Sequence, residues 1–420
     1  MASQLLQGFR VLDLTDEKGA LSGKMFADMG AEVIKVEPPA GCSTRSIPPF
    51  LEDRPGPDRS LYAIAYHAGK KSVTANLDSP DARALIEGLA GKSDFLVESH
   101  DLGYLDSIGL GYDQLAKRNP RLIYTSIMPF GDKGPARDWR WADLITWAAG
   151  GAMFMMGDQG KPPLEMSLPQ AGLHAGAEAT VAALIAHYPR QVDGQGQRIV
   201  VNMQACIVWT LMNEQAMPIL HGNFIARSGR FTGSADNRRK MVFKCKDGHM
   251  SSLIGGGPVG APSTKALIAW MAEKGAAPQW MIDKDWASWV PGMFMKMTQK
   301  DWDEVHEMED AIEKFFMTMT KAEIYEQTLK RRLLLGPVAT VADIAQDQQL
   351  RAREYFVDID YRETLGCTLK LPGAFAKLSQ TPIGPAGRAP RAGEHNREIY
   401  CGLAGITAER LAELAARGAI

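Results

Sequence analysis

The sequence has little cysteine, no excess of charge of one sign and no long apolar run. Its cysteines are far apart in a chain of 420 residues: Cys42, Cys206, Cys245, Cys367 and Cys401. None of them forms a pair with metal-ligand spacing, so we expect reduced thiols, no disulfide framework and no metal site. Apolar runs such as residues 143–156 are too short and too interrupted to cross a bilayer.

The charges are balanced. Lys and Arg number 47 and Asp and Glu number 49, which gives a formal net charge of −2. Without a basic excess, neither a nucleic acid nor a membrane surface is an expected partner. The N-terminus has no charged segment followed by an apolar core, so we expect no signal peptide and a cytoplasmic protein.

The first third of the chain alternates between strand and helix patterns. Residues 9–15 and 32–37 are short runs of strand formers, and residues 20–30 between them have apolar side chains at helical spacing. The alternation continues with strands over 72–77, 93–99 and 121–127 and helices over 80–90 and 112–118. It predicts an α/β fold with a parallel sheet and helices on both faces.

The pattern changes near residue 225 and again near Gly336-Pro337. Residues 240–254 predict a hairpin that turns at Asp247-Gly248. The stretch 264–333 is helical and rich in Met and Trp, which are typical of core packing. Residues 371–390 predict an extended, proline-rich path, and a final helix is expected from Thr407. A chain of this length is expected to form two domains.

Six blocks that together span nearly the whole chain carry a family likeness. They are LQGFRVLDLTDEKGALSGKMFADMGAEVIKVE (6–37), GKKSVTANL (69–77), VESHDLGYLDSIGLGYDQLAKRNPRLIYTSIMPFGDKGP (97–135), GQGQRIVVNM (194–203), LLGPVATVADIAQDQQLRAREYF (334–356) and APRAGEHNREIY (389–400). In this order they resemble the class III coenzyme A transferases, a superfamily that includes formyl-CoA and carnitine CoA-transferases and acyl-CoA racemases.

The resemblance implies a fold and an assembly. The expected large Rossmann-like domain covers residues 1–224 and 334–420, with a parallel sheet built from both chain ends. A smaller α+β domain covers 225–333. Members of the family thread two subunits through each other, so an interlocked dimer is expected.

The resemblance also implies a reaction. A carboxylate attacks the CoA thioester, and the acyl group passes through a covalent intermediate to an acceptor acid. No cofactor is expected beyond the CoA thioester itself, which is the substrate.

The nucleophile of the family is an aspartate four residues before a glycine that corresponds to Gly172. That position is Leu168, which has no lone pair with which to attack a thioester. Glu165 is the nearest carboxylate upstream and would serve only from a shifted loop. The racemase histidine position is Ala142, and Asp143 is expected to cap the following helix. His174 is expected to be a packing residue.

The resemblance assigns coenzyme A contacts to Arg45, Lys70, Lys71 and Ser72. Two family site positions differ, however. Ser107 stands where the family has an arginine, which removes a bidentate phosphate contact. Cys42 replaces the aspartate of a Gly-Asp pair. Residues 255–257 form a glycine run that we expect to be a flexible connection, with a loop that reaches into a partner's site as the alternative.

These departures predict a subunit of a heteromeric CoA-transferase that lacks the catalytic aspartate and has a homologous catalytic partner. The paired subunits it most resembles move CoA from succinyl-CoA to an aryl-substituted dicarboxylic acid such as benzylsuccinate, and the partner subunit alone would then hold the CoA thioester. The alternatives are a homodimeric transferase that uses Glu165, a CoA-binding protein without activity, and a nucleotide-dependent oxidoreductase. Glu37 would suit a dinucleotide, but the first turn lacks G-x-G-x-x-G.

Overall fold

The structure is a computed structural model that describes residues 4–212, 219, 227–234, 237–289, 297–385 and 387–420. The chain divides into two compact units. The first comprises Met1–Met153, Glu165–Asn223 and Gln348–Ile420, and the second comprises Phe154–Leu164 and Phe224–Asp347. Each unit has a hydrophobic core of its own. The domain boundary expected between residues 224 and 225 lies outside the described residues.

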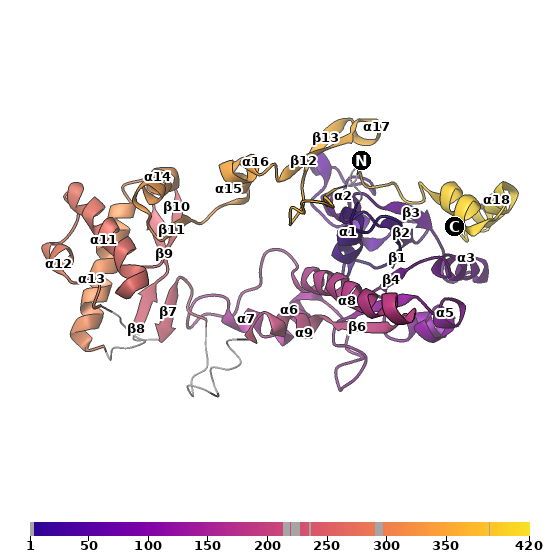
Figure 1. The fold of residues 1–420 in the computed structure, drawn as a ribbon, viewed down its shortest axis with the longest axis horizontal. Helices are drawn as coiled ribbons and strands as arrows, with labels where there is room; N and C mark the ends of the chain where they lie inside the picture. The colour runs from indigo at the N-terminus through magenta and orange to yellow at the C-terminus, as the bar shows by residue number, and fades with distance from the viewer. Residues whose placement is uncertain (1–3, 213–218, 220–226, 235–236, 290–296, 386) are drawn as a thin grey trace. The chain divides into compact units, whose positions relative to one another are not determined.

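Six parallel strands form the sheet of the first unit in the order β3-β2-β1-β4-β5-β6 (Figure 1). Their bounds are Lys71–Thr74 for β3, Glu32–Glu37 for β2, Arg10–Leu14 for β1, Phe95–Glu98 for β4, Ile123–Met128 for β5 and Arg198–Asn202 for β6. Every neighbouring pair is parallel. The parallel α/β sheet predicted from the alternating strand and helix patterns is therefore confirmed.

The C-terminal end of the chain contributes to this unit but adds no strand to the sheet. All six strands come from residues 10–202, whereas a sheet built from both chain ends was expected. The returning segment instead bonds along the edge strand β3. The His395 backbone N–H donates to the Ser72 carbonyl (2.9 Å), and the Thr74 N–H donates to the Asn396 side chain (2.8 Å). These hydrogen bonds satisfy polar groups of the edge strand β3, but the returning segment does not pair with β3 as a strand.

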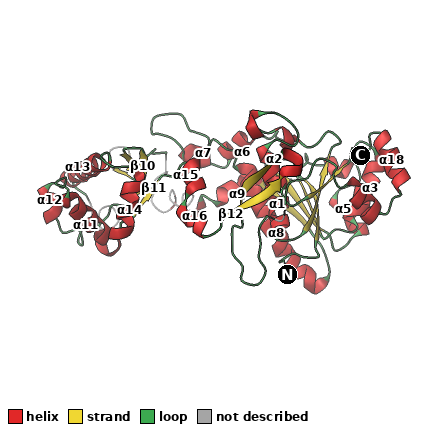
Figure 2. Cartoon of the chain, turned by 90° about the horizontal axis from the view of Figure 1, so that it is seen from above, coloured by secondary structure: helices red, strands yellow, loops and turns green. Residues whose placement is uncertain are grey.

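Helices cover both faces of the sheet (Figure 2). Leu96 of β4 belongs to a core shared with α3 (Pro80–Ala90), α5 (Tyr112–Arg118), the π-helix η3 (Arg397–Ala404) and α18 (Ala408–Ala416). The neighbouring Phe95 packs on Phe26 of α1 (Ala20–Asp28) at 5.1 Å between ring centroids. Because successive strand residues point to opposite faces, α1 lies on the other face, and α8 (Ala171–Asp193) packs against it.

Small residues let α8 approach α1 closely. A Cβ added at Gly176 would lie 3.1 Å from the Leu21 Cβ and 3.2 Å from the Ser22 amide nitrogen. One turn further along α8, the Thr180 hydroxyl and the Ser22 hydroxyl are 3.0 Å apart. A larger side chain at residue 176 would therefore push the two helices apart.

The second unit packs helices on small antiparallel sheets. Strands β9 (Val242–Cys245), β10 (Gly248–Ser252) and β11 (Leu335–Pro337) form one sheet, and β7 (Phe231–Ser234) and β8 (Asn237–Lys240) form another. The predicted hairpin is β9-β10. Cys245 pairs with Gly248, so the turn residues are Lys246 and Asp247, one position earlier than expected.

Within the described residues, α13 (Gln299–Phe316) and α14 (Lys321–Arg331) pack on these sheets, α11 (Gly257–Glu273) packs against α14, and α12 (Gln279–Asp283) packs on α11. The Met- and Trp-rich stretch forms the core between them, as predicted. Trp270, Met271, Met281, Trp286 and Met308 are each at most 2% exposed.

The glycine run 255–257 is a tightly packed helix start rather than a flexible connection. Gly256 is the N-cap of α11. A Cβ there would lie 1.5 Å from the Trp289 carbonyl oxygen, and a Cβ on Gly260 would lie 2.6 Å from the Gly255 carbonyl carbon. The absent side chains are what let these backbone segments touch.

The remaining elements lie at the ends of the strands and in the connections. They are η1 (Ser43–Ser46), η2 (Leu51–Asp53), α2 (Leu61–His67), α4 (Tyr104–Ser107), α6 (Asp143–Ala149), α7 (Ala152–Met155), α9 (Met203–Trp209), α15 (Val341–Gln346), α16 (Gln348–Ala352), β12 (Phe356–Tyr361), α17 (Arg362–Leu365) and β13 (Cys367–Pro372). The predicted C-terminal helix is α18, capped by Thr407.

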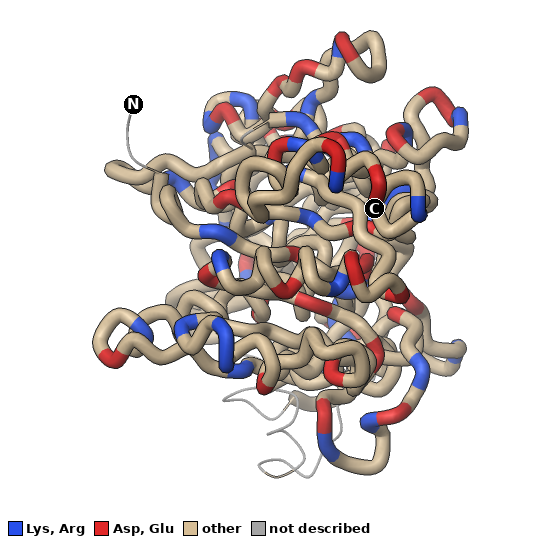
Figure 3. Tube along the Cα trace, turned by 90° about the vertical axis from the view of Figure 1, so that its right-hand side faces the viewer, with Lys and Arg blue, Asp and Glu red and all other residues tan. Residues whose placement is uncertain are grey.

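Charged residues of both signs are interspersed along the chain trace (Figure 3). Among the described helices, none combines the length and the apolar character that crossing a membrane requires.

Candidate functional site

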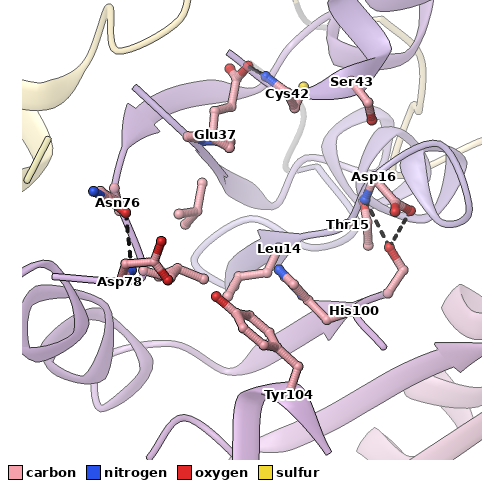
Figure 4. A pocket seen from close by; sticks show the side chains of 15 residues that line it. Leu14, Thr15, Asp16, Glu37, Cys42, Ser43, Asn76, Asp78, His100 and Tyr104 are labelled. Carbon is pink, nitrogen blue, oxygen red and sulfur yellow. Dashed lines mark hydrogen bonds between the residues drawn. The ribbon is translucent and has the colours of Figure 1, made fainter. Parts of the chain in front are cut away.

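A cavity of about 470 Å³ opens at the carboxyl ends of β1, β2, β3 and β4 (Figure 4). Its lining begins with Leu14, Val36 and Ala75, the residues at or just after the ends of the first three strands. The strand order reverses between β1 and β4, and ligands of open parallel sheets bind in the crevice outside this point. The topology and the cavity therefore indicate the same site.

Glu37 ends β2 on the wall of this cavity, but its carboxylate is fully occupied. One oxygen accepts from the Arg45 Nη2 (2.7 Å) and the Ser72 hydroxyl (2.6 Å). The other accepts from the Arg45 Nε (2.6 Å) and the Cys42 backbone N–H (3.1 Å). These four donors use the lone pairs that a dinucleotide ribose would need, so the oxidoreductase interpretation of Glu37 finds no support.

The four residues assigned to coenzyme A lie at three separate places, and none of them lines the cavity. Arg45 and Ser72 meet at Glu37, and Arg45 also donates to the Pro390 carbonyl at 3.0 Å. Lys71 lies at the sheet edge, where it pairs with Glu32 and Glu398, each at 2.7 Å. The charges of both cations are thus balanced within the fold.

Lys70 is buried in a second charged group, beneath the loop that follows β1. Its ammonium group contacts the Asp13 carboxylate at 2.8 Å, and Lys35 lies 3.5 Å from the other oxygen of the same carboxylate. Burial alone would raise the pKa of Asp13, but the two lysines and the Thr15 hydroxyl outweigh burial and hold that pKa well below its usual value. Burial lowers the pKa of Lys70 despite the pairing with Asp13.

Three polar side chains that line the cavity have free functional groups. Among the described residues, neither the Asp78 carboxylate nor the Tyr104 hydroxyl has a hydrogen-bond or ion-pair partner. The His100 Nδ1 is buried without a hydrogen bond, 3.7 Å from the Glu98 carboxylate. The His100 and Tyr104 rings stack with centroids 5.3 Å apart, and Figure 4 shows them side by side below the cavity.

The opposite wall of the cavity carries groups that bond to one another. Asp16 accepts from the Ser99 hydroxyl at 2.7 Å and pairs with Lys18. Among the described residues that line the cavity, none is a lysine or an arginine.

Cys42 also lines the cavity, and its thiol contacts the Thr44 hydroxyl at 2.7 Å. The same hydroxyl lies 2.7 Å from the His67 Nε2. Burial raises the pKa of the Cys42 thiol, and burial with the charges of Lys70 and Lys35 lowers the pKa of His67 well below its usual value. Both groups are therefore neutral at pH 7, and Cys42 is not an activated nucleophile.

Leu168 lies on the exposed loop that leads into α8. Its side chain is 67% exposed, and Glu165 on the same loop is exposed too. Among the described residues, the Glu165 carboxylate has no hydrogen-bond or ion-pair partner. The helix after this loop begins close to the backbone that follows β1. A Cβ on Gly172 would lie only 2.9 Å from the Glu17 carbonyl oxygen. The loop is thus joined to a helix start that touches the segment beside Asp16.

Asp143 caps a helix other than the expected one. It is the first residue of α6, whose N-cap is Ala142. Its carboxylate instead accepts from the Gln170 N–H (2.9 Å) and the Gly172 N–H (3.2 Å), at the start of α8. His174 packs beside Trp147, with ring centroids 6.1 Å apart, in line with the packing role expected of it.

The sequence interpretation did not single out Asp78, His100 and Tyr104. Asp78 was assigned only to the turn before Pro80, where Ser79 is the N-cap of α3. The sequence did contain a signal for these residues. Asp78 and His100 each follow a strand of the predicted parallel sheet, at the carboxyl edge where ligands bind. Ser107 lies on α4, outside the cavity lining, and its hydroxyl bonds the Tyr104 carbonyl. The described residues contain no cluster suited to a metal ion.

Comparisons with known proteins agree on one family. The sequence profile described as CoA-transferase family III matches residues 6–396. The succinyl-CoA:(R)-benzylsuccinate CoA-transferase subunit BbsE of Thauera aromatica is 31% identical over 410 residues, covering 97% of each chain. A formyl-CoA:oxalate CoA-transferase of Streptomyces avermitilis is 30% identical over 439 residues, covering 100% of each chain.

A solved structure shares the fold. The CAIB/BAIF family protein from Brucella suis superposes with a TM-score of 0.80 at 23% identity, covering 96% of this chain and 100% of that one.

Proposed function

The chain belongs to CoA-transferase family III, and we propose that it is a subunit without a nucleophilic carboxylate that works with a homologous catalytic subunit. The feature that supports this proposal is that residue 168, the position to which the resemblance assigns the family's aspartate, is a leucine. Attack on a thioester carbonyl needs a nucleophile with an available lone pair. An isobutyl side chain has none, so the covalent step falls to the partner.

The state of the assigned coenzyme A contacts supports this role. Arg45 and Lys70 are 4% exposed, and each pairs with a buried carboxylate. Recruiting Arg45 to a phosphate would break its buried pair with Glu37, and recruiting Lys70 would leave Asp13 with only the longer contact to Lys35. Breaking such a buried pair costs about 3–5 kcal/mol. A partner subunit that holds the CoA thioester avoids that cost.

An exposed apolar surface on α8 supports the proposal of a partner subunit. Along α8, Ile185, Tyr188 and Val192 are 67%, 77% and 84% exposed, on the face opposite the alanines that pack on α1 and the sheet. Contiguous exposed apolar side chains of this size are typical of protein–protein interfaces. The similar Thauera aromatica protein carries the word subunit in its name. We assign this face of α8 to the homologous subunit.

The substrates follow from the same relative. We propose that the complex moves CoA from succinyl-CoA to an aryl-substituted dicarboxylic acid such as benzylsuccinate. The donor and the acceptor are those in the printed name of the relative that is 31% identical over 97% of this chain.

The test is the Leu168→Asp variant of the chain, mixed with its homologous subunit and incubated with succinyl-CoA. The wild-type chain is expected to gain no acyl group, and the variant is expected to gain one that hydroxylamine removes, followed by mass spectrometry. The matched control is Met166→Asp, on the same loop and also exposed, which is expected to stay unmodified. Because the substitution supplies only the nucleophile, any gain locates the reacting thioester beside residue 168.

Two outcomes contradict the proposal. One is robust transfer by the wild-type chain alone, and its loss in a Glu165→Gln variant would favour the homodimeric alternative. The other is the absence of acylation in Leu168→Asp when the chain is mixed with its partner, which would remove residue 168 from the reaction.

A further inference from the structure

The crevice at the carboxyl ends of β1 to β4 has free polar groups, and none of the described residues that line it is a cation that could neutralise a phosphate. Of the three carboxylates that line it, Glu37 is saturated by Arg45, Ser72 and a backbone N–H, and Asp16 is paired with Lys18. Asp78 alone keeps an unpaired carboxylate at the cavity. The local charge that a ligand would meet is therefore negative.

The other free groups favour a planar ring and hydroxyl donors. His100 and Tyr104 stack on each other at the cavity wall, and Leu14, Val36 and Leu77 add apolar surface. Rings and apolar walls of this kind hold a nucleobase by stacking. A carboxylate only accepts hydrogen bonds, so Asp78 suits the hydroxyl groups of a sugar.

We infer that this crevice binds a nucleoside whose ribose hydroxyls are free and selects against one that carries a phosphate on the ribose, as coenzyme A does. The inference rests on the proposed function in one respect: a subunit that had to hold the CoA thioester itself would need a crevice that accepts the ribose phosphate.

Charge repulsion sets the size of the selection. A phosphate monoester carries about −1.5 to −2 charges at pH 7. At roughly 6 Å in water, its repulsion with one carboxylate reduces binding by about tenfold. Because the Asp78 carboxylate is exposed to solvent, salt screens this repulsion, and the discrimination is expected to shrink as the ionic strength rises.

The test compares two ligands that differ by one phosphate. Isothermal titration calorimetry of the full-length chain with 3′-dephospho-CoA and with CoA is expected to show about tenfold tighter binding of the dephosphorylated form at low salt. The Asp78→Asn variant keeps the size of the side chain and removes its charge. It is therefore expected to bind CoA more tightly and to remove the difference in affinity between the two ligands. The matched control is Asp101→Asn, because Asp101 is an exposed carboxylate that does not line the cavity. This variant is expected to show the same difference in affinity as the wild type.

Three results overturn the inference: equal or tighter binding of CoA, no measurable binding of either ligand, or an unchanged gap in Asp78→Asn. None of them bears on the missing nucleophile of the proposed function, because acylation of Leu168→Asp is measured on a different residue by a different readout.

Discussion

At the scale of single residues, Glu37 organises the loop behind the ligand crevice. Its carboxylate fixes Arg45, Ser72 and the Cys42 backbone. Burial by itself would raise the pKa of Glu37, but the hydrogen bonds and charge of Arg45 outweigh burial and hold that pKa well below its usual value of 4.5. A carboxyl group with a lowered pKa stabilises the fold above its unfolded-state pKa, and this contribution is lost as the pH falls.

We therefore predict that Glu37→Gln lowers the free energy of unfolding by about 3–5 kcal/mol at pH 7, because it breaks the buried pair and leaves the Arg45 guanidinium with only the partly exposed Asp58 as a charge partner. Below pH 4.5 the difference from wild type is expected to narrow progressively, because proton uptake by Glu37 then stabilises the unfolded wild-type chain while the folded carboxylate is still ionised. Urea unfolding at pH 7 and at pH 4 measures both effects.

The control is Glu32→Gln, whose ion pairs with Arg10 and Lys71 are partly exposed and contribute about 0–1 kcal/mol. A constant difference between Glu37→Gln and wild type across this pH range would contradict the assignment.

At the scale of elements, the start of α8 depends on a cap supplied by another helix. Asp143 of α6 accepts from the backbone N–H groups of Gln170 and Gly172. This bond holds the end of the loop that carries Leu168, directly before the close contact of Gly172 with Glu17. The position of residue 168 is thus set by α6 as well as by α8.

The Asp143→Ala variant is expected to lower the free energy of unfolding by about 1 kcal/mol, as the loss of a capping side chain does. It should also speed hydrogen exchange at the Gln170 and Gly172 amides, which lose their acceptor. Asp143→Asn is expected to retain most of the protection because an amide oxygen still accepts.

Asp138→Ala, at an exposed site nearby, is the control and is expected to change stability by no more than about 0.5 kcal/mol. Unchanged exchange at both amides in Asp143→Ala would show that the cap is not formed in solution.

At the scale of the whole molecule, the proposed role requires a partner that covers the apolar face of α8. Ile185 is 67% exposed in the single chain, so changing it costs little folding stability. Ile185→Lys is expected to weaken association with the homologous subunit by about tenfold or more, because it places a charge in a desolvated interface. Analytical ultracentrifugation of the mixed subunits measures the change.

Leu329→Lys on α14, where the leucine is 65% exposed, is the matched control and is expected to leave association unchanged. Wild-type affinity in Ile185→Lys would move the interface away from this face of α8.

The sequence by itself determined the family and the sheet. Residues 32–37 and 121–127 are short runs of strand formers that alternate with helix patterns, and this local pattern, typical of a parallel sheet, can be recognised in the sequence. The proposal for Leu168 likewise rests on sequence order alone. Helix ends were also predictable where the signal is local, as at Thr407 and at Ser79-Pro80.

Only the tertiary structure decided which polar groups are free. Lys70 and Arg45 look like surface cations in the sequence, but the fold brings Asp13 and Glu37 against them across strands, and each charge is then balanced. Asp143 likewise bonds to a helix start 27 residues away. Asp78, which looked like an ordinary turn residue, is left without a partner at the crevice. Pairing depends on distances in space between residues far apart in the chain, and sequence spacing does not contain those distances.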